Sequence, residues 1–160
     1  MDDPQWLVDE MLGRLSRYLR FLGYDTEYVH GVADEEIARR SRAEHRRVIT
    51  RDRALAAGLP SSILLTRTDI AGQMQELARA YPSLRRQVRL DRCTLCNGEL
   101  VRLEEGRSPP AGPPGTPAGV LVGKVPLFRC SRCAHLFWEG SHTKSMRVRL
   151  AQWIPASPVS

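Results

Sequence analysis

Two aspartates stand directly behind short apolar runs in this sequence of 160 residues. Asp9 follows the run WLV at 6–8, and Asp52 follows VITR at 48–51. Such runs are typical of buried strands in a parallel sheet, although periodicity alone also fits a buried helix. The carboxyl ends of parallel strands face one crevice, where two carboxylates would repel each other unless a cation lay between them. The pattern therefore predicts a Mg²⁺ or Mn²⁺ site and phosphoryl-transfer chemistry.

Two more aspartates, Asp34 and Asp69, precede predicted helices and are candidates for the same site. An aspartate in this position often serves as the helix N-cap, so each has a structural alternative. Glu35 follows Asp34 and is the substitute if Asp34 faces away. We predict a catalytic set of Asp9, Asp34, Asp52 and Asp69, of which Asp9, Asp34 and Asp52 bind Mg²⁺ or Mn²⁺.

The elements that must position these carboxylates alternate between strand and helix. Leucines at 12, 15, 19 and 22 form the apolar stripe of an amphipathic helix, and Gly23 is its natural stop. The predicted strands cover 6–8, 25–29, 47–50 and 62–65, and the predicted helices cover 11–22, 54–57 and 70–81, with another beginning at Asp34. This order predicts an α/β fold, a three-layer α/β/α domain with a parallel sheet and right-handed crossovers.

Two Cys-x-x-Cys pairs, separated by 33 residues, define a second module. Its four thiols, Cys93, Cys96, Cys130 and Cys133, match the structural Zn²⁺ site of a zinc ribbon. The alternatives are two disulfides or a pair of redox motifs. His135 is a possible substitute ligand, but four thiolates already fill a tetrahedron, so a surface or turn histidine is favoured.

The two modules set the predicted domain boundaries. Residues 1–88 form the α/β domain and 91–150 the ribbon, whose strands we expect at 99–103, 125–129 and 136–139. The stretch 106–119 is rich in Pro and Gly, which is typical of a disordered loop.

Charge divides between the modules in the same way. Residues 1–84 carry 12 Lys and Arg against 13 Asp and Glu, whereas residues 85–160 carry 12 against 5, so the net charges are −1 and +7. A basic module beside an acidic crevice suits a polyanion such as RNA, although a solubilising surface is the plainer alternative. The predicted RNA-binding residues are Arg14, Arg51, His142, Lys144 and Arg147.

Two of these RNA contacts have explicit alternatives. His142 can contact phosphate at a helix N-terminus, or it can be an exposed histidine beside a cap made by Ser141. Phe128, Phe137 and Trp138 can stack on bases, but aromatic residues in a small ribbon usually form its core, and the core is favoured.

The sequence gives no indication of a secreted protein, a membrane protein or a nucleoside triphosphatase. The N-terminal residues MDDP lack the basic and apolar regions of a signal peptide, and no apolar stretch approaches the roughly 18 residues of a membrane helix. We therefore expect a cytoplasmic protein without membrane contact. No phosphate-binding loop of the Gly-x-x-x-x-Gly-Lys type is present, so nucleoside triphosphate hydrolysis is not indicated.

Five segments carry a family resemblance: 7–15 (LVDEMLGRL), 18–26 (YLRFLGYDT), 33–37 (ADEEI), 50–53 (TRDR) and 137–142 (FWEGSH). Together with the ribbon, the sequence resembles the PIN-like ribonucleases named after the C-terminal domain of the Mut-seven exonuclease. The resemblance implies a PIN-like fold and metal-dependent RNase activity. It places Asp9, Asp34 and Asp52 on the PIN acidic pattern, with Asp69 near the fourth position.

The sequence thus predicts a metal-dependent endoribonuclease whose acidic site binds Mg²⁺ or Mn²⁺ and whose zinc ribbon aids RNA binding. Two other functions stay open. One is a non-catalytic protein that binds RNA or the ribosome, and the other is a toxin-type nuclease controlled by a protein partner.

Overall fold

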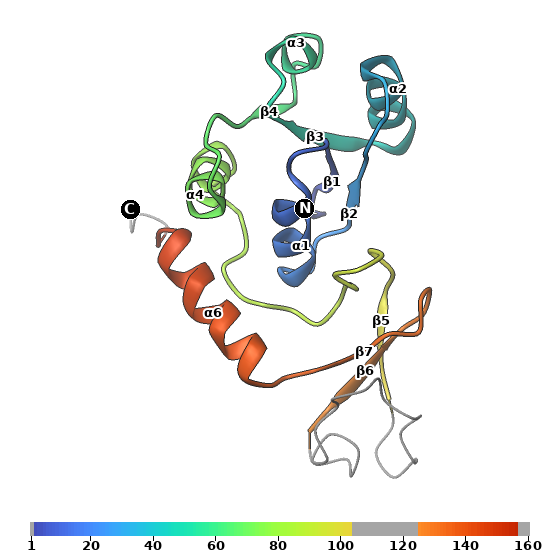
Figure 1. The fold of residues 1–160 in the computed structure, drawn as a ribbon, viewed down its shortest axis with the longest axis vertical. Helices are drawn as coiled ribbons and strands as arrows, with labels where there is room; N and C mark the ends of the chain where they lie inside the picture. The colour runs from blue at the N-terminus through green and yellow to red at the C-terminus, as the bar shows by residue number, and fades with distance from the viewer. Residues whose placement is uncertain (1, 104–124, 157–160) are drawn as a thin grey trace.

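Strands and helices alternate through the first part of the chain in the computed structural model, which describes residues 2–103 and 125–156 (Figure 1). The elements are β1 (Gln5–Val8), α1 (Gly13–Phe21), β2 (Thr26–Tyr28), α2 (Asp34–Glu44), β3 (Arg46–Thr50), α3 (Arg53–Ala57), β4 (Ile63–Leu64) and α4 (Ile70–Ala80). The predicted alternation is confirmed, while the predicted loop 106–119 lies outside the described residues. No helix in the described ranges combines the length and apolar character needed to cross a membrane.

The four strands form one sheet in the order β2-β1-β3-β4, and every neighbouring pair is parallel. Val8 at the end of β1 is in register with Tyr28 on one side and Ile49 on the other. The chain moves from β1 outward to β2 and then returns across the sheet to β3. The connections therefore change direction between β1 and β3, and a crevice forms outside their carboxyl ends at such a point.

Alternate residues of the strands enter two separate cores, because successive side chains of a strand point to opposite faces. Trp6 and Val8 join the larger core with α1 and α4, whereas Leu7 joins the smaller one with Ile37 of α2 and Leu55 of α3. All three strand residues have no exposed surface. Helices thus cover both faces, which confirms the α/β prediction with its parallel sheet and three layers.

The ribbon is a small antiparallel sheet in the order β5-β6-β7. Its strands are β5 (Leu100–Arg102), β6 (Leu127–Cys130) and β7 (Leu136–Trp138). Its apolar cluster consists of Leu127 and Leu136, with Trp138 packed against them among others. The core interpretation is thus right for Trp138, whereas Phe137, the intervening residue of β7, lies outside this cluster.

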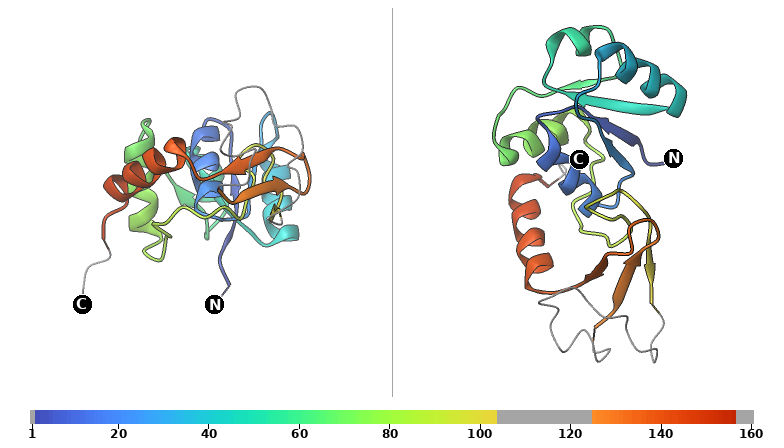
Figure 2. Two further views of the ribbon diagram at one scale, coloured as in Figure 1. Left: turned by 90° about the horizontal axis from the view of Figure 1, so that it is seen from below. Right: turned by 45° about the vertical axis from the view of Figure 1, so that its right-hand side comes forward.

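Helix α6 (Ser141–Trp153) begins where the sequence predicts a helix N-terminus, and its length and its return from the ribbon to α4 were not predicted (Figures 1 and 2). Met146 and Leu150 are buried in the larger core of the α/β domain, and Trp153 meets Tyr18 of α1 with 5.2 Å between the ring centroids. The boundaries 1–88 and 91–150 stay predictions. The apolar face of α6 nevertheless packs on the first of these two ranges although most of the helix lies in the second.

Candidate active site and metal centre

Asp9 and Asp52 follow β1 and β3, the two central strands of the sheet. Thr50, which is fully buried, connects them: its Oγ1 donates to Oδ2 of Asp9 at 2.9 Å and accepts from the backbone N–H of Asp52 at 2.9 Å. The N–H of Asp9 also donates to the carbonyl of Ile49 at 3.1 Å. These bonds fix both residues beside each other at the carboxyl ends of the two central strands.

Asp52 also has a structural role, because it is the N-cap of α3. Its Oδ1 accepts hydrogen bonds from the N–H groups of Ala54 at 2.8 Å and Leu55 at 3.3 Å. Among the described residues, Oδ2 of Asp52 has no hydrogen-bond partner. One oxygen therefore holds the side chain in place, and the other is available to a ligand.

Asp34 is the first residue of α2, and the N-cap is Ala33, which makes no side-chain capping bond. The N-cap alternative is therefore wrong for Asp34, whose side chain is exposed. Partial desolvation and then the negative charges of Asp52, Asp9 and Glu35 raise the pKa of Asp34 above its usual range. The carboxylates from β1, α2 and β3 thus lie near enough to act on one another.

Asp69 adopts the structural alternative. It is the N-cap of α4: its Oδ2 accepts from the N–H of Gly72 at 2.8 Å, and its Oδ1 lies 3.3 Å from Nε of Arg67. The hydrogen bond from Gly72 is the largest cause that lowers the pKa of Asp69, and Arg67 adds to it. The charges that act on Asp34 do not include Asp69. The catalytic role expected from the sequence is not tested by these contacts, which support only the structural role.

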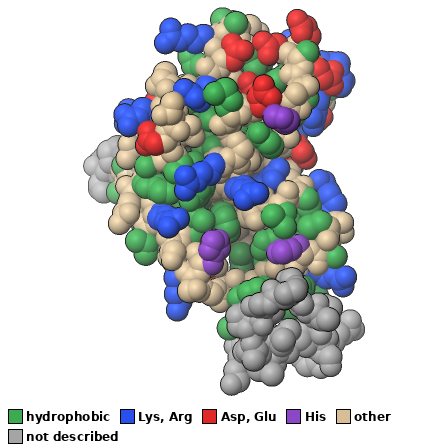
Figure 3. Space-filling model, in the orientation of Figure 1, with side chains coloured by type: hydrophobic (Ala, Val, Ile, Leu, Met, Phe, Trp, Pro, Cys, Tyr) green, Lys and Arg blue, Asp and Glu red, His purple; other side chains and the backbone are tan. Residues whose placement is uncertain are grey.

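Acidic side chains gather at the end of the molecule formed by α2 and α3 (Figure 3). Glu10, next to Asp9, turns away from them to pair with His30 at 3.2 Å and to accept from the N–H of Gly31 at 3.0 Å. Within the described ranges, no three carboxylates converge closely enough to form a metal cage. The acidic residues thus form an open arrangement rather than a closed set of ligands.

The four cysteines, by contrast, converge tightly. The sulfur atoms of Cys93, Cys96, Cys130 and Cys133 all lie within 4.8 Å of one another. Each Cys-x-x-Cys pair ends in a turn whose next residue has positive φ, Asn97 at 69° and Ala134 at 65°. These turns close with hydrogen bonds from Asn97 N to Cys93 O at 2.9 Å and from Ala134 N to Cys130 O at 3.0 Å.

The chemistry of this cluster fits a Zn²⁺ ion. Burial raises the pKa of Cys93 to about 12, whereas at Cys130 the N–H groups of Cys133 and Arg132 outweigh burial and lower the pKa to about 6. Four thiolates at this separation would repel one another strongly without a cation, and tetrahedral thiolate coordination is typical of structural zinc. The four cysteines can therefore hold zinc. His135 is exposed and packs against Phe137 instead.

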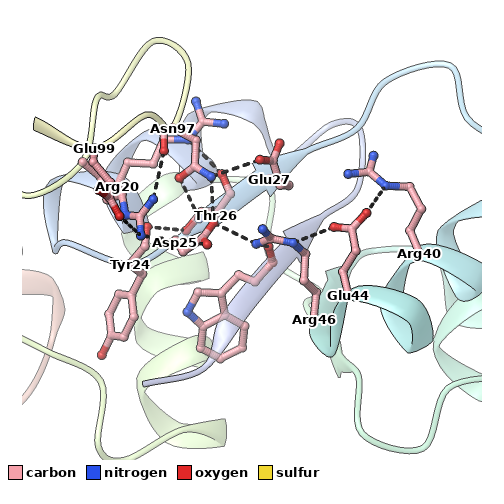
Figure 4. Close-up of polar contacts among 12 residues, drawn as sticks. Arg20, Tyr24, Asp25, Thr26, Glu27, Arg40, Glu44, Arg46, Asn97 and Glu99 are labelled. Carbon is pink, nitrogen blue, oxygen red and sulfur yellow. Dashed lines mark hydrogen bonds and ion pairs between the residues drawn. The ribbon is translucent and has the colours of Figure 1, made fainter. Parts of the chain in front are cut away.

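Asn97, at the first cysteine turn, connects the ribbon to the edge strand β2 (Figure 4). Its Oδ1 accepts from the N–H of Thr26 at 2.8 Å, and its Nδ2 donates to Asp25 at 2.7 Å and to Glu27 at 3.2 Å. Burial would raise the pKa of Asp25, but hydrogen bonds from Arg46 and Asn97 hold it below its usual range. The cysteine turn is thus fastened to the sheet that carries the acidic residues.

A second connection runs from α1. Nε of Arg20 donates to the carbonyl of Thr26 at 2.9 Å, and its Nη1 donates to the carbonyl of Thr94 at 3.1 Å. Only 7% of Arg20 is exposed, and this burial lowers its pKa. Thr94 lies between the first two cysteines, so α1, β2 and the ribbon form one connected unit.

The predicted RNA-binding residues come from three separate parts of the chain: α1, the end of β3, and α6. Arg14 is exposed on α1, while Arg51 lies between Thr50 and Asp52 with its Nε buried and without a hydrogen-bond partner in the described structure. His142 and Lys144 are exposed in the first turn of α6, and Arg147 pairs with Glu139.

The N-cap of α6 is Gly140, and it makes no side-chain bond. The Ser141 cap is therefore wrong, and His142 lines a cavity beside α1.

The class of protein defined by this fold and site is a parallel α/β domain with acidic residues at its strand ends, joined to a small ribbon whose four cysteines can hold zinc. Residues 4–150 match the Mut7-C RNAse domain family model, and the chain belongs to this family. No curated protein and no solved structure matches the chain. Family membership confirms the resemblance and indicates a ribonuclease, which is a hydrolase that acts on RNA.

Proposed function

We propose that this ribonuclease is a metal-dependent endoribonuclease whose active site is the open acidic end of the sheet. The observation that carries the proposal is that Asp9 and Asp52 follow two adjacent parallel strands and are connected through Thr50, with Asp34 near enough to feel both charges. Like charges are placed together in this way at metal sites, where a divalent cation removes the repulsion.

Each carboxylate has a definite part in such a site. Asp9 is oriented by Thr50, and Asp52 is held by the first turn of α3, so both present an oxygen from a fixed position. Asp34 has no capping bond and is free to turn toward a ligand. When bound, Mg²⁺ or Mn²⁺ supplies an activated water and stabilises the leaving oxygen of the phosphodiester.

The ribbon, in this proposal, aids RNA binding and holds a structural Zn²⁺ at its four cysteines. Its connection to β2 through Asn97 and to α1 through Arg20 keeps RNA on the ribbon within reach of the acidic end. The excess positive charge of residues 85–160 supports a role in holding a polyanion.

The test is cleavage of a circular RNA with Mn²⁺, because a circle has no end from which an exonuclease can start. Asp52→Asn removes the charge but keeps the N-cap, since asparagine caps as well as aspartate. We expect Asp9→Asn and Asp52→Asn to lose cleavage by at least about a hundredfold, with Tm and zinc content unchanged. Asp69→Asn, which also keeps its cap, is the matched control and should still cleave.

A non-catalytic RNA-binding protein is the second candidate. The observation in its favour is that the carboxylates do not converge on one point in the described structure. Tight binding of the circle without metal-stimulated cleavage would support this candidate and contradict the endoribonuclease. Undiminished cleavage by Asp9→Asn would show that the acidic residues are wrongly assigned.

A further inference from the structure

Two cavities lie beside α1, on the side that faces the ribbon. Their volumes are about 390 and 510 Å³. Arg17, Thr94 and Leu95 line both of them, so the two cavities are neighbouring parts of one groove. We call it the α1 groove.

The first end of the α1 groove reaches toward the acidic residues. Gly13, Arg14 and Tyr28 line this end. Tyr28 is the last residue of β2, in register with Val8, and the turn into α1 is closed by a hydrogen bond from Leu12 N to Asp9 O at 3.3 Å. A Cβ at Gly13 would lie 3.3 Å from the Tyr28 ring, so the glycine lets this ring lie over the start of the helix.

The other end is aromatic and lies against the ribbon. Phe21, Phe137, Trp138 and two histidines line it. The ring of His142 lies 6.3 Å from that of Phe21, and the ring of His135 lies 4.9 Å from that of Phe137. Phe137 is not part of the ribbon's apolar cluster, so packing of the ribbon core does not account for its position.

Positive charge lines the path between the two ends. Arg14 and Arg17 stand three residues apart on one face of α1, and both are exposed. Neither makes a hydrogen bond or ion pair with another of the described residues, whereas Arg20 is engaged with Thr26 and Thr94. Figure 3 shows basic side chains across the middle of the molecule, between the acidic end and the ribbon.

We propose that the α1 groove binds single-stranded RNA, with a base stacked in the aromatic end, backbone phosphates on Arg14 and Arg17, and the strand leading toward the acidic residues. This inference rests on the proposed function and names its substrate class. Helix α1 has nine residues and is about 13.5 Å long at 1.5 Å per residue. At a stacked spacing of about 3.4 Å per nucleotide, a few nucleotides span the groove.

Physical chemistry favours an unpaired strand here. A base in a duplex is already stacked and paired, so only an unpaired base can enter an aromatic cavity without breaking the helix. Base stacking on aromatic side chains is tolerant of sequence, because every base has a π-face. Arginines without carboxylate partners are available to neutralise phosphates, which makes binding dependent on salt.

The first experiment uses photochemical crosslinking of single-stranded RNA that contains 5-iodouridine. The protein is the full chain with zinc and the Asp9→Asn substitution, so that cleavage does not remove the probe. We expect crosslinks on Phe21, Phe137 or Trp138, located by mass spectrometry of the crosslinked peptides. If RNA binds but crosslinks form only at other residues, or do not form at all, the proposal that a base stacks in the aromatic end of the groove is wrong.

The second experiment measures the affinity of the same RNA for three further variants. Arg17→Ala should weaken binding and reduce the slope of log K against log salt by about 0.7 for one lost phosphate contact. Arg79→Ala, which removes an exposed arginine of α4 outside both cavities, is the matched control. Phe137→Leu keeps the apolar side chain but removes the π-face, and should cost at least about fivefold in affinity for single strands.

The outcomes separate this inference from the proposed function. If Arg17→Ala and Phe137→Leu weaken binding but the wild type cleaves no RNA, RNA binding by the α1 groove is supported and endoribonuclease activity is contradicted. If the wild type cleaves and Arg17→Ala binds like Arg79→Ala, the groove is wrong. If Phe137→Leu loses zinc, its affinity for RNA cannot be interpreted, and the comparison of Arg17→Ala with Arg79→Ala alone tests the groove. Equal affinity for duplex RNA would also overturn the single-strand assignment.

Discussion

The cysteine centre and the acidic end of the sheet are both candidate metal sites, and they are built in opposite ways. Four sulfur atoms lie within 4.8 Å of one another, with Cys93 and Cys130 buried. At the acidic end, Asp34 and Asp52 are exposed, and no three carboxylates converge in the described structure. Structural zinc sites are closed, whereas catalytic sites keep positions open for water and substrate.

The difference arises because the residues of the cysteine site are close together in the sequence, whereas those of the acidic site are far apart. Each Cys-x-x-Cys turn positions two ligands by itself, and antiparallel pairing of β5 with β6 brings the two turns together. Asp9, Asp34 and Asp52 instead come from three parts of the fold, and their carboxylates come near one another only when the α/β domain has formed. A closed site therefore stabilises the fold, while an open one depends on it.

The largest expected effect breaks the closed site. Cys93→Ser should abolish binding of one zinc per chain and unfold the ribbon, because structural zinc contributes on the order of 10 kcal/mol in small zinc domains. Elemental analysis gives the zinc content, and NMR spectra show which residues become unfolded. Ser131→Ala, between two cysteines, is the control. Retention of one zinc by Cys93→Ser would rule out four-cysteine coordination.

The next effect concerns the connection between the two regions. Asn97→Ala should lower the free energy of unfolding by about 2–3 kcal/mol, because it removes buried hydrogen bonds to β2 and leaves alanine in a left-handed conformation. Urea denaturation measures this change.

Asn97→Gly separates the two causes, since glycine tolerates positive φ and lacks only the amide. If both variants are as stable as the wild type, the ribbon is not fastened through this residue.

A smaller effect distinguishes Asp69 from the other acidic residues. Asp69→Ala should lower Tm by a few degrees, because it removes the N-cap of α4, while cleavage is retained. The folded-state pKa lies below the ordinary 3.8, so this stabilisation is complete above that pH and is lost as the pH falls through the lowered pKa.

The Tm difference between Asp69→Ala and the wild type should therefore stay constant from about pH 6 to 8. Thermal melts across that range measure it. Loss of metal-stimulated cleavage at full stability would place Asp69 in the active site instead.

The smallest effect tests whether the zinc site is truly closed. His135→Ala should leave the zinc content at one ion per chain, because the histidine packs on Phe137 and four thiolates fill the tetrahedron. Competition with a chromogenic chelator compares the zinc affinities of variant and wild type. A large loss of affinity would mean that His135 displaces one of the cysteines.

Much of the fold was predictable because its signals are local. The leucines of α1 and the stop at Gly23, with φ of 84°, follow from helix periodicity and from the freedom of glycine at positive φ. The ribbon strands were also predicted near their observed positions. The start of α6 was predicted, but its extent and packing were not, because its apolar residues contact α4 and α1, which are distant in sequence.

The candidate site shows the same division. Helix capping involves only a single turn of the chain. From the sequence, however, Asp34 and Asp69 are each either a helix N-cap or a catalytic carboxylate. The structure assigns the cap of α4 to Asp69 and that of α2 to Ala33, because backbone geometry at each helix start decides which side chain reaches the free N–H groups. Phe137 was assigned to the core for a similar reason, since alternation along a three-residue strand does not reveal which face is covered.

By itself, the sequence determined the alternation of strands and helices, the four cysteines that come together, and the aspartates that follow β1 and β3. Those features arise from periodicity, turn chemistry and short spacings, which act between neighbouring residues. The tertiary structure alone decided that β1 and β3 are adjacent, that Asn97 fastens the ribbon to β2, and that Arg17 and Phe137 line one groove. These depend on contacts between residues far apart in the chain, and only the folded packing brings them together.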